Sequence, residues 1–218
     1  MKKWYLTISA LILLSMGLTG CSDATSHSRG VYMLLDTSGT YAKELSKAQA
    51  IINYLLGTLN PGDSLAVARI DTGSFSEKDI VSKITFDKRP SVSNGQKRNF
   101  KDKIDQFVSS VNASQYTDIA GGILQAVEYL NETGAGKKHI LIFSDLEQDL
   151  VKGYVRDFAI QMDGIHVVAL NVTKLRSDNV DPRKYLERLE EWKHKVEDGG
   201  GVFRVINDLE RLDSLLSE

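Results

Sequence analysis

The sequence predicts an α/β protein built on a doubly wound, mostly parallel six-stranded sheet with helices on both faces. Apolar runs of strand length, such as residues 31–35 and 138–143, alternate with stretches whose apolar residues recur at helical spacing. Strands that alternate with helices favour parallel β-α-β units, in which the helices cover the sheet. The hydrophobic content of the 218-residue chain, 42%, is enough for a core of this kind.

The first half of the chain contains five expected elements. Val31 to Leu35 is uniformly apolar, as in a parallel strand that is buried on both faces. Apolar residues then recur at helical spacing as far as Leu59, and Asn60-Pro61-Gly62-Asp63 marks a turn. The expected elements are a strand over 30–36, a helix over 40–59, strands over 64–71 and 79–87, and a helix over 95–111.

The second half continues the alternation. Asp181 is expected to cap a helix with Pro182 at its first position, and the three glycines from Gly199 end that helix. Asn207 with Glu210 three residues later is typical of a capping box and predicts a final helix. Residues 151–162 fit neither the helical nor the strand period. The expected elements before that final helix are a helix over 119–132, strands over 138–144 and 165–171, a helix over 182–197 and a strand over 202–206.

The first twenty residues have the pattern of a signal peptide. Lys2 and Lys3 form a positive start, and the apolar stretch over residues 4–16 is too short to predict a membrane span. The stretch is followed by Leu18-Thr19-Gly20-Cys21, which resembles the lipobox of bacterial lipoproteins.

This resemblance implies cleavage before Cys21 and lipidation of that cysteine, which would tether the protein to a membrane of the bacterial cell envelope. In an enteric-type envelope, Ser22 at the next position implies sorting to the outer membrane, facing the periplasm. Residues 22–29 are polar and predict a flexible tether, so the folded domain is expected to span 30–218. The alternatives are an ordinary signal peptide followed by an incidental cysteine, or an uncleaved anchor.

The charge balance argues against a nucleic-acid partner. The chain has 27 basic and 29 acidic residues, a formal net charge of −2, and loss of Lys2 and Lys3 with the signal peptide changes it to −4. No block of Lys or Arg stands out, whereas nucleic-acid binding needs a basic surface. Cys21 is the single cysteine of the chain, which excludes an internal disulfide bond.

Polar side chains follow two of the expected strands and precede one of the expected helices. Asp36-Thr37-Ser38-Gly39-Thr40 comes after the first strand, Thr117 precedes the helix over 119–132, and Asp145 comes after the strand over 138–144. Open α/β sheets bind ligands at the carboxyl ends of their strands, and oxygen ligands suit a hard divalent cation. For the first run alone, the alternative is an Asx turn with a helix cap.

Together these loops resemble the metal-ion-dependent adhesion site of von Willebrand factor type A domains. That pattern is Asp-x-Ser-x-Ser after the first strand, a Thr in a middle loop and an Asp after the fourth strand. Its positions fall on Asp36, Ser38, Thr40, Thr117 and Asp145, with Thr40 in place of the usual Ser. The likeness extends from Gly30 to the C-terminus. It implies a Rossmann-like sheet with one antiparallel edge strand, and a bound Mg²⁺ or Mn²⁺ whose open position takes an acidic residue of a protein partner.

Two classes of function follow. The first is a lipid-tethered, metal-dependent binding module without enzymatic activity. The second is a phosphatase similar to the haloacid-dehalogenase-like enzymes, with Asp36 as nucleophile and Asp145 and Asp149 as Mg²⁺ carboxylates. The second is disfavoured because Ser38 stands where those enzymes keep an acid/base Asp, and because Thr117 would have no role in it.

The neighbouring acidic residues are not expected to bind metal. Asp118, Glu147 and Asp149 are interpreted as solvated loop carboxylates or helix caps, as charged residues in loops usually are. His139 and His166 lack the spacing of metal ligands and are expected to be packed in or beside strands.

Overall fold

A computed structural model describes residues 27–39, 41, 44–70, 75–112, 114–172, 181–208, 212 and 215–216. Two predicted site residues, Cys21 and Thr40, lie outside these ranges. So does most of the expected final helix, of which only Leu212, Leu215 and Leu216 are described. No helix in the described ranges is both long and apolar enough to cross a bilayer.

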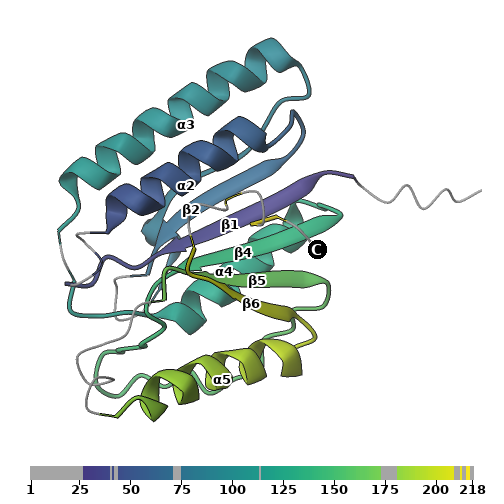
Figure 1. Cartoon of the computed structure of the whole chain (residues 1–218). Coiled ribbons are helices and arrows are strands. Elements are labelled where there is room, and N and C mark those ends of the chain that lie inside the picture. The colour runs from purple at the N-terminus through teal and green to yellow at the C-terminus, as the bar shows by residue number, and fades with distance from the viewer. Residues whose placement is uncertain are drawn as a thin grey trace, which may run out of the picture.

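Six strands form one sheet in the spatial order β3-β2-β1-β4-β5-β6 (Figure 1). Strand β3 pairs antiparallel with β2, and every other neighbouring pair is parallel. The predicted doubly wound sheet with one antiparallel edge strand is therefore confirmed. The strands are β1 (Arg29–Leu35), β2 (Ser64–Arg69), β3 (Ile80–Thr85), β4 (Lys137–Phe143), β5 (Ile165–Leu170) and β6 (Val202–Ile206).

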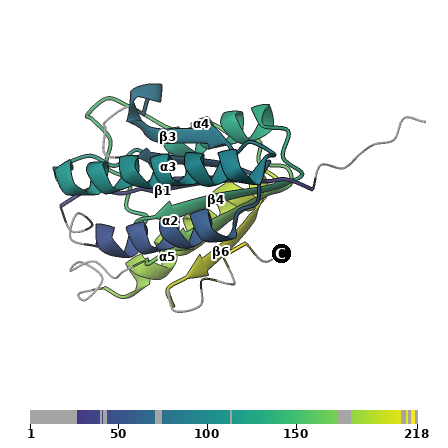
Figure 2. The ribbon, with the colours of Figure 1, turned by 90° about the horizontal axis from the view of Figure 1, so that it is seen from above.

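Helices cover both faces of this sheet, as Figures 1 and 2 show from two directions. Helices α2 (Leu45–Thr58) and α3 (Pro90–Ser110) pack on one face, and α4 (Ile119–Glu132) and α5 (Arg183–Asp198) pack on the other. Side chains of β1 alternate between the two cores, with Tyr32 and Leu34 toward α4 and Met33 toward α2. A central strand buried on both faces explains the uniformly apolar sequence of β1.

Two helices begin away from their predicted positions. Helix α3 starts at Pro90, five residues before the expected start, since proline is well placed in a first turn and its missing N–H costs nothing there. Because the first part of α3 is mostly polar, the spacing of apolar residues does not indicate a helix there. Helix α2 starts at Leu45, five residues after the expected start. Before it, Tyr41 N donates to Ser38 O at 2.8 Å and Glu44 N donates to Tyr41 O at 2.8 Å.

The connection between β4 and β5 contains no helix and no regular strand over residues 144–164. We call residues 149–162 of this connection the strap. Its end is packed between α4 and α5, where Met162 is buried and its N–H donates to the carbonyl of Gly199 at 2.6 Å. Tyr154, Val155 and Phe158 remain exposed. This mixture of inward and outward side chains explains why the segment fits neither period.

Candidate functional site

The candidate site lies where the strand order reverses, between β1 and β4. The chain runs outward from β1 to β2 on one side and from β4 to β5 on the other (Figure 1). The last residues of the two central strands, Leu35 and Phe143, are in register, so the loops that follow them are adjacent. This edge of a doubly wound sheet is where such folds bind ligands.

Asp36 is the first residue after β1 and is fully buried. One of its carboxylate oxygens, Oδ1, accepts the N–H of Ser38 at 2.8 Å, and Oδ2 accepts the hydroxyl of Ser144 at 2.7 Å. The Asx turn considered for this run is therefore present. The second contact joins the loop after β1 to the loop after β4.

The middle loop, residues 114–118, packs against the Asp36 loop. Ser114 N donates to Thr37 O at 3.1 Å, and Asp118 N donates to the carbonyl of Ile70, just past β2, at 2.9 Å. Thr117 is buried in this loop, with 3% of its surface exposed. The structure thus brings Asp36, Ser38, Thr117 and Asp145 to one edge of the sheet.

Asp118, next to Thr117, is fully buried rather than solvated. Its role as a helix cap is confirmed, because its carboxylate accepts the N–H of Gly121 in the first turn of α4 at 2.9 Å. The same carboxylate accepts the N–H of Phe75 at 2.8 Å and pairs with the Arg156 guanidinium at 2.7 Å. Burial would raise the pKa of Asp118, but Arg156 and the two N–H donors together hold that pKa below its usual value.

Asp145 occupies the loop after β4 with 5% of its surface exposed. Burial raises the pKa of its carboxyl to about 6; the N–H of Glu147 opposes this shift, and the charge of Asp36 adds to it. The loop is tightly turned: Leu146 has a positive φ of 65°, and its N–H donates to Ser144 Oγ at 3.0 Å. Two buried carboxylates are thus placed at the ends of neighbouring strands, and the charge of Asp36 adds to the rise in the pKa of Asp145.

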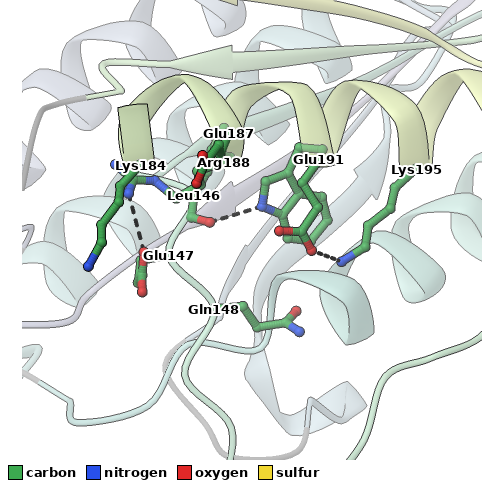
Figure 3. Close-up of a pocket in the computed structure, with 9 residues that line it drawn as sticks. Leu146, Glu147, Gln148, Lys184, Glu187, Arg188, Glu191 and Lys195 are labelled. Atoms are coloured by element: carbon green, nitrogen blue, oxygen red, sulfur yellow. Dashed lines mark hydrogen bonds and ion pairs between the residues drawn. The ribbon is translucent and has the colours of Figure 1, made fainter. Parts of the chain in front are cut away.

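Side chains of α5 fasten the Asp145 loop from the side (Figure 3). Arg188 Nε donates to the carbonyl of Asp145 at 2.8 Å, and Trp192 Nε1 donates to the carbonyl of Leu146 at 2.9 Å. Arg188 also pairs with Glu147 at 3.3 Å. The backbone of this loop is therefore fixed by a helix that begins 38 residues after Asp145.

A groove of about 540 Å³ separates this loop from α5. Its charged groups are largely paired with one another: Arg188 with Glu147, and Lys195 with Glu191 at 2.7 Å, as the dashed lines in Figure 3 mark. Neither Asp36 nor Asp145 is among the lining residues. These residues are Leu146, Glu147, Gln148, Lys184, Glu187, Arg188, Glu191, Trp192 and Lys195. The groove thus presents a largely paired polar surface beside the candidate site.

The remaining acidic residues and histidines singled out from the sequence are exposed in a loop or lie within strands. Glu147 and Asp149 are exposed, as predicted, and the backbone of Asp149 pairs with that of Thr117. His139 is buried within β4, and its ring lies 5.4 Å from that of His166. Within the part of the chain that is described, no three His, Cys, Asp or Glu side chains gather in a group that could hold a metal ion.

Several residues of the site were not predicted from the sequence. Ser144 directly precedes Asp145, so its proximity in sequence was a usable signal. Arg156 and Arg188 carried no such signal, because each reaches its partner across about 40 residues of chain: 38 from Arg156 to Asp118 and 43 from Arg188 to Asp145.

No protein-family model matches the chain, and no curated protein matches it. Solved structures do. A von Willebrand factor type A protein from Catenulispora acidiphila aligns with a TM-score of 0.54 and 16% identity, over 86% of this chain and 40% of that one. BatB from Bacteroides thetaiotaomicron aligns with a TM-score of 0.51 and 16% identity, over 86% and 94% of the two chains. An aerotolerance-related membrane protein from Bacteroides fragilis gives 0.51 and 14%, over 86% and 96%. The chain therefore has the von Willebrand factor type A fold, as its sequence predicted.

Proposed function

We propose that this protein is a divalent-metal-dependent protein-binding module in which Asp36, Ser38, Thr40, Thr117 and Asp145 hold Mg²⁺ or Mn²⁺. The observation that carries the proposal is the pair of buried carboxylates, Asp36 and Asp145, at the ends of the two strands that form the switch point. The fold supports it, because the three loops that resemble the metal-ion-dependent adhesion site lie at one edge of the sheet.

The residues present fit a small, hard cation. The donors are carboxylate and hydroxyl oxygens, which Mg²⁺ and Mn²⁺ prefer and which zinc sites seldom use alone. The pKa of Asp145 is raised mainly by burial, and a cation beside Asp36 and Asp145 would offset the repulsion by Asp36 that adds to this shift. Ser38 and Thr117 are neutral donors, so most of the cation's charge would stay available to a carboxylate from a partner protein. We therefore propose an acidic residue of the partner as the ligand.

A phosphatase is the competing function. It would need Asp36 as a nucleophile, yet both oxygens of that carboxylate already accept hydrogen bonds and the residue is fully buried. The middle loop is also left without a role in this chemistry, although Thr117 is packed into the site. The contacts of the site therefore favour a binder over an enzyme.

Activity and binding assays on the full chain separate the two functions. We expect no hydrolysis of a generic aryl phosphate with Mg²⁺, and capture of an envelope protein that is released by EDTA and lost in Asp145→Asn. Asp181→Asn, which changes an exposed carboxylate, should leave capture intact. Phosphate-ester turnover that disappears in Asp36→Asn would overturn the binding function and establish the enzyme.

The proposal includes a lipid anchor at Cys21, which rests on the sequence of the lipobox. In a Gram-negative host, Ser22 would direct the protein to the outer membrane, facing the periplasm. A single acyl chain holds a protein on a membrane only marginally, so a multiply acylated cysteine is expected.

Lipidation is tested by metabolic labelling with a fatty-acid probe. The wild-type chain should be labelled and should sediment with membranes, whereas Cys21→Ala should be unlabelled and, because its signal peptide is not processed as a lipoprotein, larger on a gel. Equal labelling of the two proteins would exclude Cys21 as the anchor.

A further inference from the structure

The strap is an unusual connection for a parallel sheet. Parallel neighbours such as β4 and β5 are most often joined through a helix, but residues 144–164 contain neither helix nor strand. Connections of this length without secondary structure are uncommon in compact domains and are usually functional. The contacts that the strap makes indicate what that function is.

Two sets of contacts join the strap to the middle loop. At its start, the backbones of Asp149 and Thr117 exchange two hydrogen bonds, of 2.8 and 3.0 Å. Seven residues later, the guanidinium of Arg156 reaches Asp118, with Nη2 at 2.7 Å from Oδ2 and Nε at 3.1 Å from Oδ1. Both contacts fall on the two residues that close the middle loop.

The Arg156 guanidinium supplies the positive charge that pairs with the Asp118 carboxylate. The carboxylate is fully buried, and the Arg156 side chain is 19% exposed, so the pair is mostly shielded from water. Removing one member of a buried ion pair leaves the other charge uncompensated, which is strongly unfavourable. The carboxylate would then have to move toward water.

Movement of Asp118 would not stay local. The same carboxylate holds the N–H of Phe75, near the end of the loop after β2, and the N–H of Gly121 in the first turn of α4. Its own backbone N–H is bonded to Ile70. Asp118 is covalently joined to Thr117, so the orientation of that hydroxyl depends on this set of contacts.

We propose that Arg156 is a positioning residue that sets the metal affinity of the site through Asp118, so that the strap belongs to the site although it supplies no ligand. This inference rests on the proposed metal-binding function. It assigns to the strap the task of holding the Thr117 loop against the ends of β1 and β2.

The test is the affinity of the full chain for Mn²⁺, measured by titration calorimetry at a temperature where circular dichroism shows every variant folded. Arg156→Met keeps the aliphatic stem and removes the charge. It should weaken Mn²⁺ binding by roughly 10- to 100-fold, the usual effect of losing a group that orients a metal ligand. Arg156→Lys should recover part of the loss. The matched control is Arg183→Met, which breaks an exposed pair with Asp181 and should bind Mn²⁺ like the wild type.

A second variant covers the case in which Arg156→Met does not fold. The double variant Asp118→Asn with Arg156→Met removes both charges of this pair, so neither is left without its partner. It should fold yet bind Mn²⁺ as weakly as expected for Arg156→Met. A lower melting temperature with unchanged Mn²⁺ affinity, in either variant, would overturn the positioning role and leave Arg156 a purely structural residue. A wild-type chain that binds no Mn²⁺ would instead overturn the proposed function, and this inference with it.

Discussion

At the scale of single residues, the candidate site depends on glycines that allow neighbouring segments to pack closely. Gly121 and Gly122 lie in the first turn of α4. A side chain at Gly122 would meet Ile70 at 2.7 Å, so this glycine lets the helix approach the sheet. At Gly121 an added Cβ would lie 2.8 Å from Cγ of Asp118, inside van der Waals contact.

We therefore expect Gly121→Ala to destabilise the protein. In most helices, replacing glycine by alanine is favourable by about 1 kcal/mol. Here the new methyl group would push the Asp118 carboxylate away from the N–H that it caps, and loss of such a cap costs about 1 kcal/mol or more. Urea unfolding should show a lower midpoint for Gly121→Ala and an equal or higher one for the control Gly95→Ala, whose nearest neighbour is 4.0 Å away in α3. A more stable Gly121→Ala would contradict this packing.

At the scale of secondary-structure elements, α5 supports the candidate site without supplying a ligand. Trp192 is 4% exposed and its indole N–H holds the carbonyl of Leu146, the residue with a positive φ. Non-glycine residues in this conformation carry strain, which the surrounding structure must offset. The helix thus fixes the turn that follows Asp145.

Trp192→Phe tests this support, because it keeps an aromatic ring and removes the donor. Leaving a buried carbonyl without its hydrogen bond costs about 1–3 kcal/mol, and the smaller ring adds to this loss. We expect a fall of that size in the free energy of unfolding. Tyr185→Phe, which removes a partly exposed hydroxyl from the same helix, should change stability by less than about 0.5 kcal/mol. Equal effects of the two substitutions would show that the Trp192 N–H contributes nothing.

The elements also show what could be predicted from the sequence. Strands buried on both faces, such as β1 and β4, were predicted within one or two residues because their apolar runs are continuous. The start of α3 was missed because its first turn, Pro90 to Ser93, is mostly polar. The strap could not be predicted at all, because its conformation is set by Asp118 and Gly199, which lie far from it in sequence.

The candidate site, like the secondary-structure elements, could be predicted only in part. The three loops could be placed at one edge because parallel strands bring their carboxyl ends together. Their internal contacts could not: the burial of Asp118 and the roles of Ser144, Arg156 and Arg188 arise only when the chain is folded.

At the scale of the whole molecule, the proposed metal site joins three segments that are distant in sequence. The loops after β1 and β4 and the middle loop before α4 all lie at one end of the sheet. A cation that binds only when these loops are assembled stabilises the folded chain over the unfolded chain. Metal binding should therefore be visible in global unfolding, without knowledge of any partner.

Thermal unfolding of the full chain in titrated MnCl₂ is the most direct test of metal binding at these loops. At a free Mn²⁺ concentration one hundred times the dissociation constant, the folded state should gain about 2.7 kcal/mol, a rise of roughly 5–11 °C in Tm for a domain of this size. The gain should disappear in Asp145→Asn and in Thr117→Val, and should persist in the control Asp181→Asn. A Tm that does not respond to Mn²⁺ or Mg²⁺, or a response that survives in both site variants, would contradict the assignment of Asp36, Ser38, Thr40, Thr117 and Asp145 as the metal site.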